Sequence, residues 1–228
     1  MAQIQTKFTP MGGQGHIPPY DPDATLEEQV HQSVELSLKH FAVEGSDPYL
    51  DCLVLHSPMP DHCDTLRIWK VLETFAPKRI RNLGISNITI QKLQALCTGV
   101  TVRPSVVQNR LYSTNEYDRE LRSWCRERGI VYQSFWTLTA NQTMLHRRPV
   151  IALAERLKIE REEAFFTLVL GLGGVSVLTG TKTADRMRGD LAGVEKVGVW
   201  AQKDGRSEWD RLLQDFKLLV GDAEDVDV

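Results

Sequence analysis

The sequence lacks the features that mark proteins of membranes and of the secretory route. No apolar segment approaches the ~18 uninterrupted residues that a membrane-spanning helix needs. The chain does not open with a charged stretch followed by an apolar one, as a targeting signal would. We therefore expect a cytoplasmic protein without a membrane partner.

Charge of one sign and cysteine are also scarce. The 228 residues have a formal net charge of −3 and contain no basic block, which predicts no nucleic-acid partner. The chain has 4 cysteines and no C-x-x-C pair, so free buried thiols are expected. His62, Cys63 and Asp64 are adjacent, but three consecutive residues at a helix start cannot converge on one metal ion.

What the chain does contain is a globular composition. It is 42% hydrophobic and 25% charged, and it is long enough for one sizeable core. No shift in composition marks a boundary. We therefore expect a single domain over residues 1–228, in which residues 219–228 form an acidic, solvated tail.

Predicted strands and helices alternate along the whole sequence. Short apolar runs between breakers predict six strands, at residues 4–9, 49–58, 79–86, 105–109, 130–136 and 175–179. Helical spacing of apolar residues, with caps at Thr25 and Thr89, predicts helices at residues 26–40, 64–75, 90–96, 117–128, 149–157, 161–170, 184–191 and 208–219. Such alternation favours a parallel sheet or barrel.

Polar residues stand where the predicted strands end. The clearest case is a buried apolar run that ends in His56, and Lys7, Ser86, Asn87 and Gln108 occupy similar positions. The carboxyl ends of parallel strands face one edge of the sheet, where active sites of such folds gather. A single histidine is explained equally well as a boundary residue. Together with Thr181 and Lys182 after the last strand, polar residues stand at five successive strand ends, which favours a site.

A second candidate site lies near the end of the chain. Lys182 and Arg186 flank a predicted helix start, with Thr181 beside them, which is the chemistry of a phosphate site. The alternative is a solvated helix start. By contrast, Gly13 and Gly15 are not followed directly by a helix, so we interpret them as part of a flexible loop rather than a phosphate loop.

In combination these motifs resemble the aldo/keto reductases. The segments that carry the resemblance are Leu-Val-Leu-His-Ser-Pro at 53–58, Ile-Arg-Asn-Leu-Gly-Ile-Ser-Asn at 80–87, Val-Gln-Asn at 107–109 and Val-Leu-Thr-Gly-Thr-Lys-Thr-Ala-Asp-Arg at 177–186. They occur in the family's order. The resemblance implies a partial (β/α)8 TIM barrel of about six βα units, with NADP(H) as the cofactor for hydride transfer to a carbonyl.

The resemblance also implies roles for the first group of polar residues. His56 is similar to the histidine that orients and polarises the substrate carbonyl, and Lys7 to the lysine that lowers the pKa of a catalytic tyrosine. Ser86, Asn87 and Gln108 resemble the residues that hold the nicotinamide carboxamide, where fixed hydrogen bonds set which face of the ring meets the substrate.

The remaining cofactor residues follow the same resemblance. Phe135 stands where the family usually has a tyrosine that stacks on the nicotinamide. Thr181 and Arg186 are similar to residues that contact the adenosine phosphate, with Lys182 as an additional cation. The family's Glu-Asn pair is absent at residues 189–190, which leaves the adenine contacts open.

The sequence departs from the family most at its start. Only six residues precede Lys7, whereas two βα units of the family supply an aspartate and the tyrosine that acts as general acid. The chain could be a fragment, a partial barrel completed by self-association, or a divergent member whose loop at residues 10–23 covers the gap. We favour a shortened protein that forms a homo-oligomer over its open strand edges.

The leading functional hypothesis is an NADP-dependent oxidoreductase that reduces a carbonyl of a small or medium metabolite. Because the tyrosine is missing, one alternative is a non-redox isomerase, cyclase or dehydratase that uses His56 and Lys7 as acid and base. The other alternative is a catalytically silent homologue.

Overall fold

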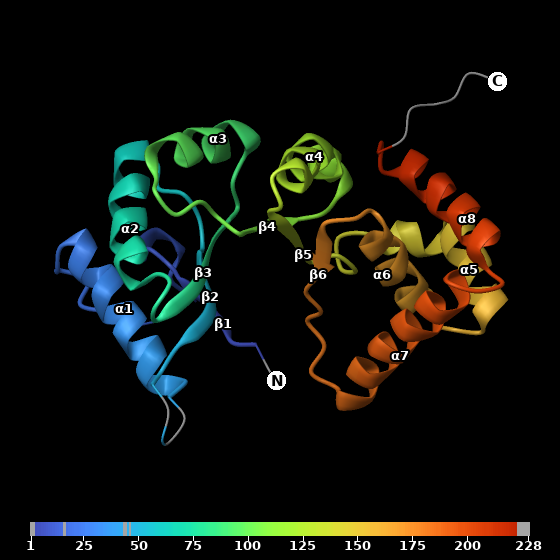
Figure 1. Cartoon of the computed structure of the whole chain (residues 1–228), viewed down its shortest axis with the longest axis horizontal. Coiled ribbons are helices and arrows are strands. Elements are labelled where there is room, and N and C mark those ends of the chain that lie inside the picture. The colour runs from blue at the N-terminus through green and yellow to red at the C-terminus, as the bar shows by residue number, and fades with distance from the viewer. Residues whose placement is uncertain (1–2, 16, 43–44, 46, 223–228) are drawn as a thin grey trace. The chain divides into compact units, whose positions relative to one another are not determined.

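The structure is a computed structural model that describes residues 3–15, 17–42, 45 and 47–222. The chain divides into two compact units, Met1–Asn109 and Arg110–Val228 (Figure 1). The single domain expected over residues 1–228 stays a prediction. Residues 223–228 of the expected acidic tail lie outside the described residues.

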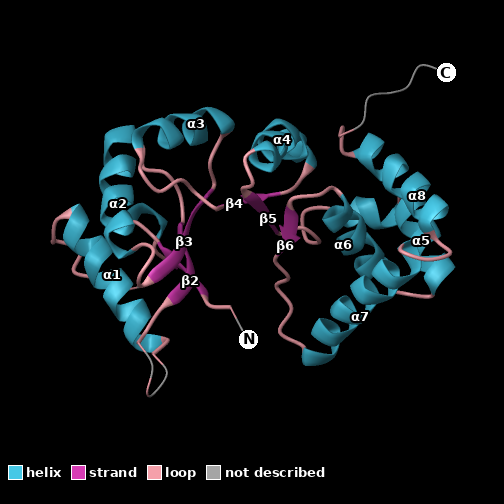
Figure 2. Cartoon of the chain, in the orientation of Figure 1, coloured by secondary structure: helices cyan, strands magenta, loops and turns pink. Residues whose placement is uncertain are grey.

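The first unit is a parallel sheet whose strands alternate with helices (Figure 2). Its strands pair in chain order, β1 with β2, β2 with β3 and β3 with β4. The elements are β1 (Gln5–Phe8), a 3-10 turn (Met11–Gly13), α1 (Leu26–His40), β2 (Leu50–Leu55), α2 (His62–Phe75), β3 (Ile80–Ser86), α3 (Ile90–Gly99) and β4 (Val106–Arg110).

Helix α1 begins at the capping box that the sequence predicts. The Thr25 hydroxyl accepts a hydrogen bond from the Glu28 N–H at 3.3 Å, and the Glu28 carboxylate accepts one from the Thr25 N–H at 2.9 Å. Val30, Val34 and Leu38 follow at helical spacing and are all buried. Local sequence therefore sets both the start of this helix and the face that it packs.

Strand pairing brings the ends of β2, β3 and β4 to one level. Leu55 lies opposite Ile85, and Ser86 lies opposite Gln108. His56 follows Leu55 directly, so it comes level with Ser86. A shift of one residue in either pairing would turn these side chains to the other face of the sheet.

Strand β3 approaches its neighbours closely at Gly84. A Cβ atom on Gly84 would lie 3.0 Å from the carbonyl oxygen of Val106 and 3.1 Å from a methyl carbon of Val54. Any side chain would therefore push β3 away from β2 and β4. Glycine at this position keeps the end of β3 in the level arrangement.

The second unit contains a pair of parallel strands, β5 and β6, and most of the remaining helices. Its elements are a 3-10 segment (Ser113–Asp118), α4 (Arg119–Glu127), β5 (Val131–Phe135), a 3-10 turn (Gln142–His146), α5 (Arg148–Leu157), α6 (Arg161–Gly171), β6 (Val175–Val177), α7 (Ala184–Ala201) and α8 (Arg206–Leu219). All six predicted strands are thus present, four in the first unit and two in the second.

Helices α2 to α8 differ from their predicted bounds, most of them by one to three residues at an end, and two differ for a physical reason that the structure shows. Helix α7 extends to Ala201 rather than ending at residue 191, because Gly193 and Val197 are buried and continue its packed face. Helix α4 begins at Arg119 instead of residue 117, because the three residues before it have φ of 50° to 54°. Left-handed backbone cannot continue into a right-handed helix.

No helix in the described part of the chain has the length and apolar character needed to cross a membrane. All four cysteines are thiols rather than members of a disulfide. Cys52 and Cys125 are buried as predicted, and burial raises the pKa of the Cys52 thiol to about 12. Cys63, by contrast, is exposed. Among the described residues, no three His, Cys, Asp or Glu side chains gather in a group that could hold a metal ion.

Candidate active site

In the first unit, backbone hydrogen bonds fix His56 between two strands. Its N–H donates to the carbonyl oxygen of Phe8 at 2.9 Å, and its own carbonyl oxygen accepts from the Asn87 side-chain amide at 2.8 Å. Asn87 has a φ of 54°, a left-handed conformation that asparagine tolerates better than most residues. Two of the predicted site residues are therefore directly linked.

Ser86 and Gln108 are joined in the same way at the next pair of strand ends. The Ser86 hydroxyl donates to the Gln108 carbonyl oxygen at 2.6 Å, and the Asn87 N–H donates to the same oxygen at 3.1 Å. Both Ser86 and Gln108 are buried. The Ser86 proton is thus held within the protein, and its oxygen lone pairs remain as acceptors for a donor such as a ligand amide.

Lys7 and His56 influence each other electrostatically. Partial burial lowers the pKa of the Lys7 amine. Partial burial is also the main reason that the pKa of His56 is lowered from 6.5, and the positive charge of Lys7 lowers it further. Near neutral pH the structure therefore favours an uncharged imidazole at His56.

The 3-10 turn at Met11–Gly13 covers one edge of the His56 ring. A Cβ atom on Gly13 would lie 3.2 Å from His56 Nδ1 and 3.1 Å from the Thr9 methyl carbon. His56 Nδ1 is buried and has no hydrogen-bond partner. The segment predicted as a flexible loop is therefore packed against the histidine at this point, and Nε2 is the ring nitrogen left to face a ligand.

Two side chains tie this turn to the end of β1. Gln14 Nε2 and the Tyr20 hydroxyl both donate to the carbonyl oxygen of Thr9, at 2.7 and 2.8 Å. Tyr20 is buried, and its ring packs on Phe8 with the ring centres 5.7 Å apart. The Tyr20 proton is thus bound to the backbone, which gives this tyrosine a structural role.

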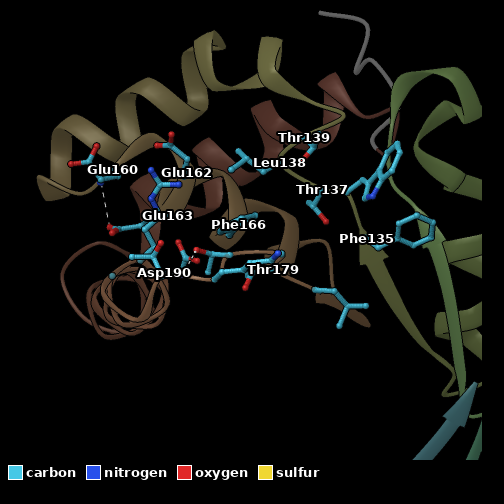
Figure 3. Close-up of a pocket in the computed structure, with 18 of the residues that line it drawn as sticks. Phe135, Thr137, Leu138, Thr139, Glu160, Glu162, Glu163, Phe166, Thr179 and Asp190 are labelled. Atoms are coloured by element: carbon cyan, nitrogen blue, oxygen red, sulfur yellow. Dashed lines mark hydrogen bonds between the residues drawn. The ribbon is translucent and has the colours of Figure 1, made fainter. Parts of the chain in front are cut away.

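The second unit contains a pocket of about 960 Å³. Figure 3 shows Phe135 at one end of the view and a group of carboxylates at the other. All four cofactor residues predicted in this unit line it, namely Phe135, Thr181, Lys182 and Arg186. The structure therefore brings together residues that are about 50 positions apart in the sequence.

The predicted helix start is present at this pocket. Helix α7 begins at Ala184, and the N–H of Thr183 donates to the Thr181 hydroxyl at 3.3 Å. Lys182 and Arg186 are both exposed. The unpaired N–H groups of a helix start and two cations are a suitable environment for a phosphate.

The pocket also has an acidic side that the sequence did not reveal. Partial burial raises the pKa of Glu163, and the nearby carboxylates of Glu160, Asp190 and Glu162 raise it further against a hydrogen bond from the Glu160 N–H. Partial burial likewise raises the pKa of Asp190, with Glu162 adding to the shift and Arg186 opposing it. The lining of the pocket therefore carries carboxylates as well as the cations at the start of α7.

Two glycines make room for Glu163. Cβ atoms on Gly189 and Gly193 would lie 3.1 and 2.6 Å from its carboxylate oxygens. Residues four apart share one face of a helix, so the pair forms a notch on α7 into which the α6 side chain fits. The spacing of these glycines was the available sequence signal, but only the packing of α6 on α7 shows what occupies the notch.

Comparison with known proteins places the chain in a family. The model of the aldo/keto reductase family matches residues 2–148, and the chain belongs to this family. An uncharacterized oxidoreductase of Bacillus subtilis, YtbE, is 28% identical over 126 residues, which cover 55% of this chain and 42% of that protein. The chain spans about half the length of the curated relatives that it matches.

Solved structures show the same fold at low identity. An aldo-keto reductase from a Medee basin deep-sea metagenome library matches 86% of this chain and 69% of its own, with a TM-score of 0.66 and 14% identity. A Bombyx mori aldo-keto reductase solved with NADP matches 88% of this chain and 67% of its own, with a TM-score of 0.65 and 18% identity. The predicted fold class is therefore confirmed, since the described strands and helices form part of a (β/α)8 barrel.

The Lys7–His56 pair makes a prediction about pH. The folded protein disfavours a charged His56, so below pH 6.5 this group binds a proton more readily in the unfolded chain than in the folded one. His56 therefore lowers the free energy of unfolding below pH 6.5, and it has no effect on that free energy well above pH 6.5. In an NMR titration, His56 should protonate below pH 6.5, and Lys7→Met should raise its pKa while leaving it below 6.5, since burial is the larger cause. Lys92→Met, a change of an exposed lysine, should alter nothing. An unchanged pKa in Lys7→Met would contradict the electrostatic pairing.

The Gly13 contact makes a second prediction. Gly13→Ala should displace the His56 ring and shift its ring NMR signals, because the added methyl group meets Nδ1. Gly12→Ala is the matched control, since a Cβ on Gly12 meets nothing within 4 Å. Equal effects of the two substitutions on the His56 signals would show that the turn does not position the histidine.

Proposed function

We propose that this chain is an NADP(H)-dependent oxidoreductase that reduces a carbonyl of a small or medium metabolite. The observation that supports this best is the level arrangement of His56, Ser86 and Gln108 at adjacent strand ends, in a member of the aldo/keto reductase family. A related structure was solved in complex with NADPH, and relatives are named glyoxal reductase and NAD/NADP-dependent indole-3-acetaldehyde reductase.

In this proposal the residues at the strand ends act on the reacting groups. His56 donates a hydrogen bond from Nε2 to the carbonyl oxygen, and it does so as the neutral ring, the form that its lowered pKa favours. Lys7 adds a positive charge that favours the developing alkoxide. Ser86, Asn87 and Gln108 hold the nicotinamide carboxamide, and bound NADPH supplies the hydride.

The pocket residues bind the cofactor. Phe135 stacks on the nicotinamide through its phenyl face, and Thr181, Lys182 and Arg186 bind the adenosine phosphate. The acidic side of the pocket favours hydrogen-bond donors on the rest of the adenosine. Stacking requires the phenyl ring of Phe135, and phosphate binding requires the hydroxyl and cationic groups at the start of α7.

A substitution of Arg186 tests whether this residue binds the phosphate that distinguishes NADPH from NADH. Arg186→Gln should weaken NADPH binding by about ten- to a hundredfold, the loss typical of a charged hydrogen bond, while NADH binding stays unchanged because NADH lacks the 2′-phosphate that NADPH carries on its adenosine. Fluorescence titration measures both. Arg188→Gln is the matched control, since Arg188 lies on the same helix and pairs with Asp185 at 2.7 Å. No NADPH binding by the unmodified protein would refute the proposed function.

We also propose that the chain works in the cytoplasm as one domain over residues 1–228 and associates with itself. The cysteine thiols support a reducing compartment.

Self-association is supported by helix α7, which exposes the apolar side chains of Met187 and Leu191, with 43% and 72% of their surfaces accessible. Leu191→Lys should lower the mass measured by light scattering, whereas Leu218→Lys on α8 should not. A monomeric unmodified protein would contradict self-association.

A further inference from the structure

Arg110 lies among three aromatic rings beside the pocket. Its guanidinium carbon is 4.1 Å from the ring centre of Trp136, 5.2 Å from that of Tyr112 and 5.8 Å from that of Phe135. Phe135 and Trp136 both line the pocket. Arg110 is not itself one of the lining residues, but it places a positive charge against the two aromatic side chains that line this part of the pocket.

This charge differs from those of the other stacked arginines because no carboxylate of the described residues pairs with it. Four other arginines of the described residues also lie over aromatic rings. Each of them pairs with a carboxylate: Arg79 with Glu35, Arg81 with Asp51, Arg128 with Glu127 and Arg156 with Glu208. Arg110 forms no such pair within the described residues, and its buried Nε has no hydrogen-bond partner. An ion pair with a carboxylate of the described residues therefore does not explain the position of the Arg110 guanidinium.

Trp136 is held in an unusual conformation against Arg110. Its φ is 53°, in the left-handed region that large side chains avoid, and 56% of its surface is exposed. A tryptophan that served only the core would be buried. Strained backbone of this kind is concentrated at positions that contact ligands. The exposed ring and the unpaired cation are therefore parts of one surface.

We propose that Arg110, oriented by Trp136, binds a carboxylate of the substrate. The aromatic rings cover faces of the guanidinium, and its edge carries N–H donors in the planar fork that matches a carboxylate. The pocket has a separate set of residues suited to phosphate, Thr181, Lys182 and Arg186. The charge at the Phe135 end is thus left for the molecule that meets the nicotinamide.

This inference rests on the proposed function and names its substrate class, aldehydes or ketones that also carry a carboxylate. In the reaction the carbonyl carbon gains a hydride from NADPH and its oxygen gains a proton from the medium or the protein. The products are the hydroxy acid and NADP⁺. The carboxylate is unchanged and serves only in binding.

The test compares 4-carboxybenzaldehyde with its methyl ester, which has the same aldehyde and ring but no charge. With NADPH, the unmodified protein should have a higher kcat/KM for the acid than for the ester. Arg110→Gln should reduce kcat/KM for the acid by about ten- to a hundredfold, mainly through KM, and leave the ester unchanged. Arg110→Lys, which keeps the charge, should restore part of the loss. Arg128→Gln, at an arginine stacked on Trp124 and paired with Glu127, is the control.

Calorimetric binding of the same two compounds without NADPH separates this inference from the proposed function. Preferential binding of the acid that is lost in Arg110→Gln, without turnover of either compound, would support the carboxylate site and refute the reductase. Turnover that is equal for the acid and the ester in both proteins would refute the carboxylate site alone. A loss of NADPH affinity in Arg110→Gln, with equal effects on both aldehydes, would also refute it, since the anion would then belong to the cofactor.

Discussion

Backbone hydrogen bonding between parallel strands is the constraint on which the candidate site of the first unit depends. The pairing of β2, β3 and β4 brings His56, Ser86 and Gln108 level, and side-chain hydrogen bonds from Ser86 and Asn87 then close the gaps between strand ends. These residues are far apart in the sequence, and they can act together only because the strands bring them close. Their convergence follows from the register, and the register follows from apolar runs that must be buried.

The strand-end site of the first unit and the pocket of the second unit differ in the charges of their side chains. Partial burial of His56, and to a lesser extent the charge of Lys7, lowers the pKa of the imidazole and favours its neutral form at the strand-end site. The pocket of the second unit holds cations at the start of α7 and carboxylates from α6 and α7. A ligand that carries both an anionic group and hydrogen-bond donors matches this lining, as a phosphorylated adenosine does.

Local signals in the sequence were sufficient for the strands and for several helix starts. The capping box of Thr25 and Glu28, the buried run before His56 and the start of α7 depend on residues close together in the chain. The end of α7 was missed because its glycines weaken the apolar pattern, although they fit the helix against Glu163.

Contacts between distant segments were beyond any local pattern. The packing of Gly13 on His56 could not be found from the sequence, because a glycine carries no sign of what it leaves room for. The same holds for Arg110, whose lack of a carboxylate partner is visible only once its neighbours are known. Strand ends could be predicted, whereas the side chains that surround them could not.

The proposed chemistry depends most on NADPH binding, to which the strand-end residues and the residues at the start of α7 are both proposed to contribute. Hydrogen–deuterium exchange of the whole protein, with and without NADPH, tests this contribution. Bound NADPH should slow exchange at residues 86–88 and 108–110 and also at residues 180–190. Slower exchange at residues 180–190 alone, or at neither set, would contradict it.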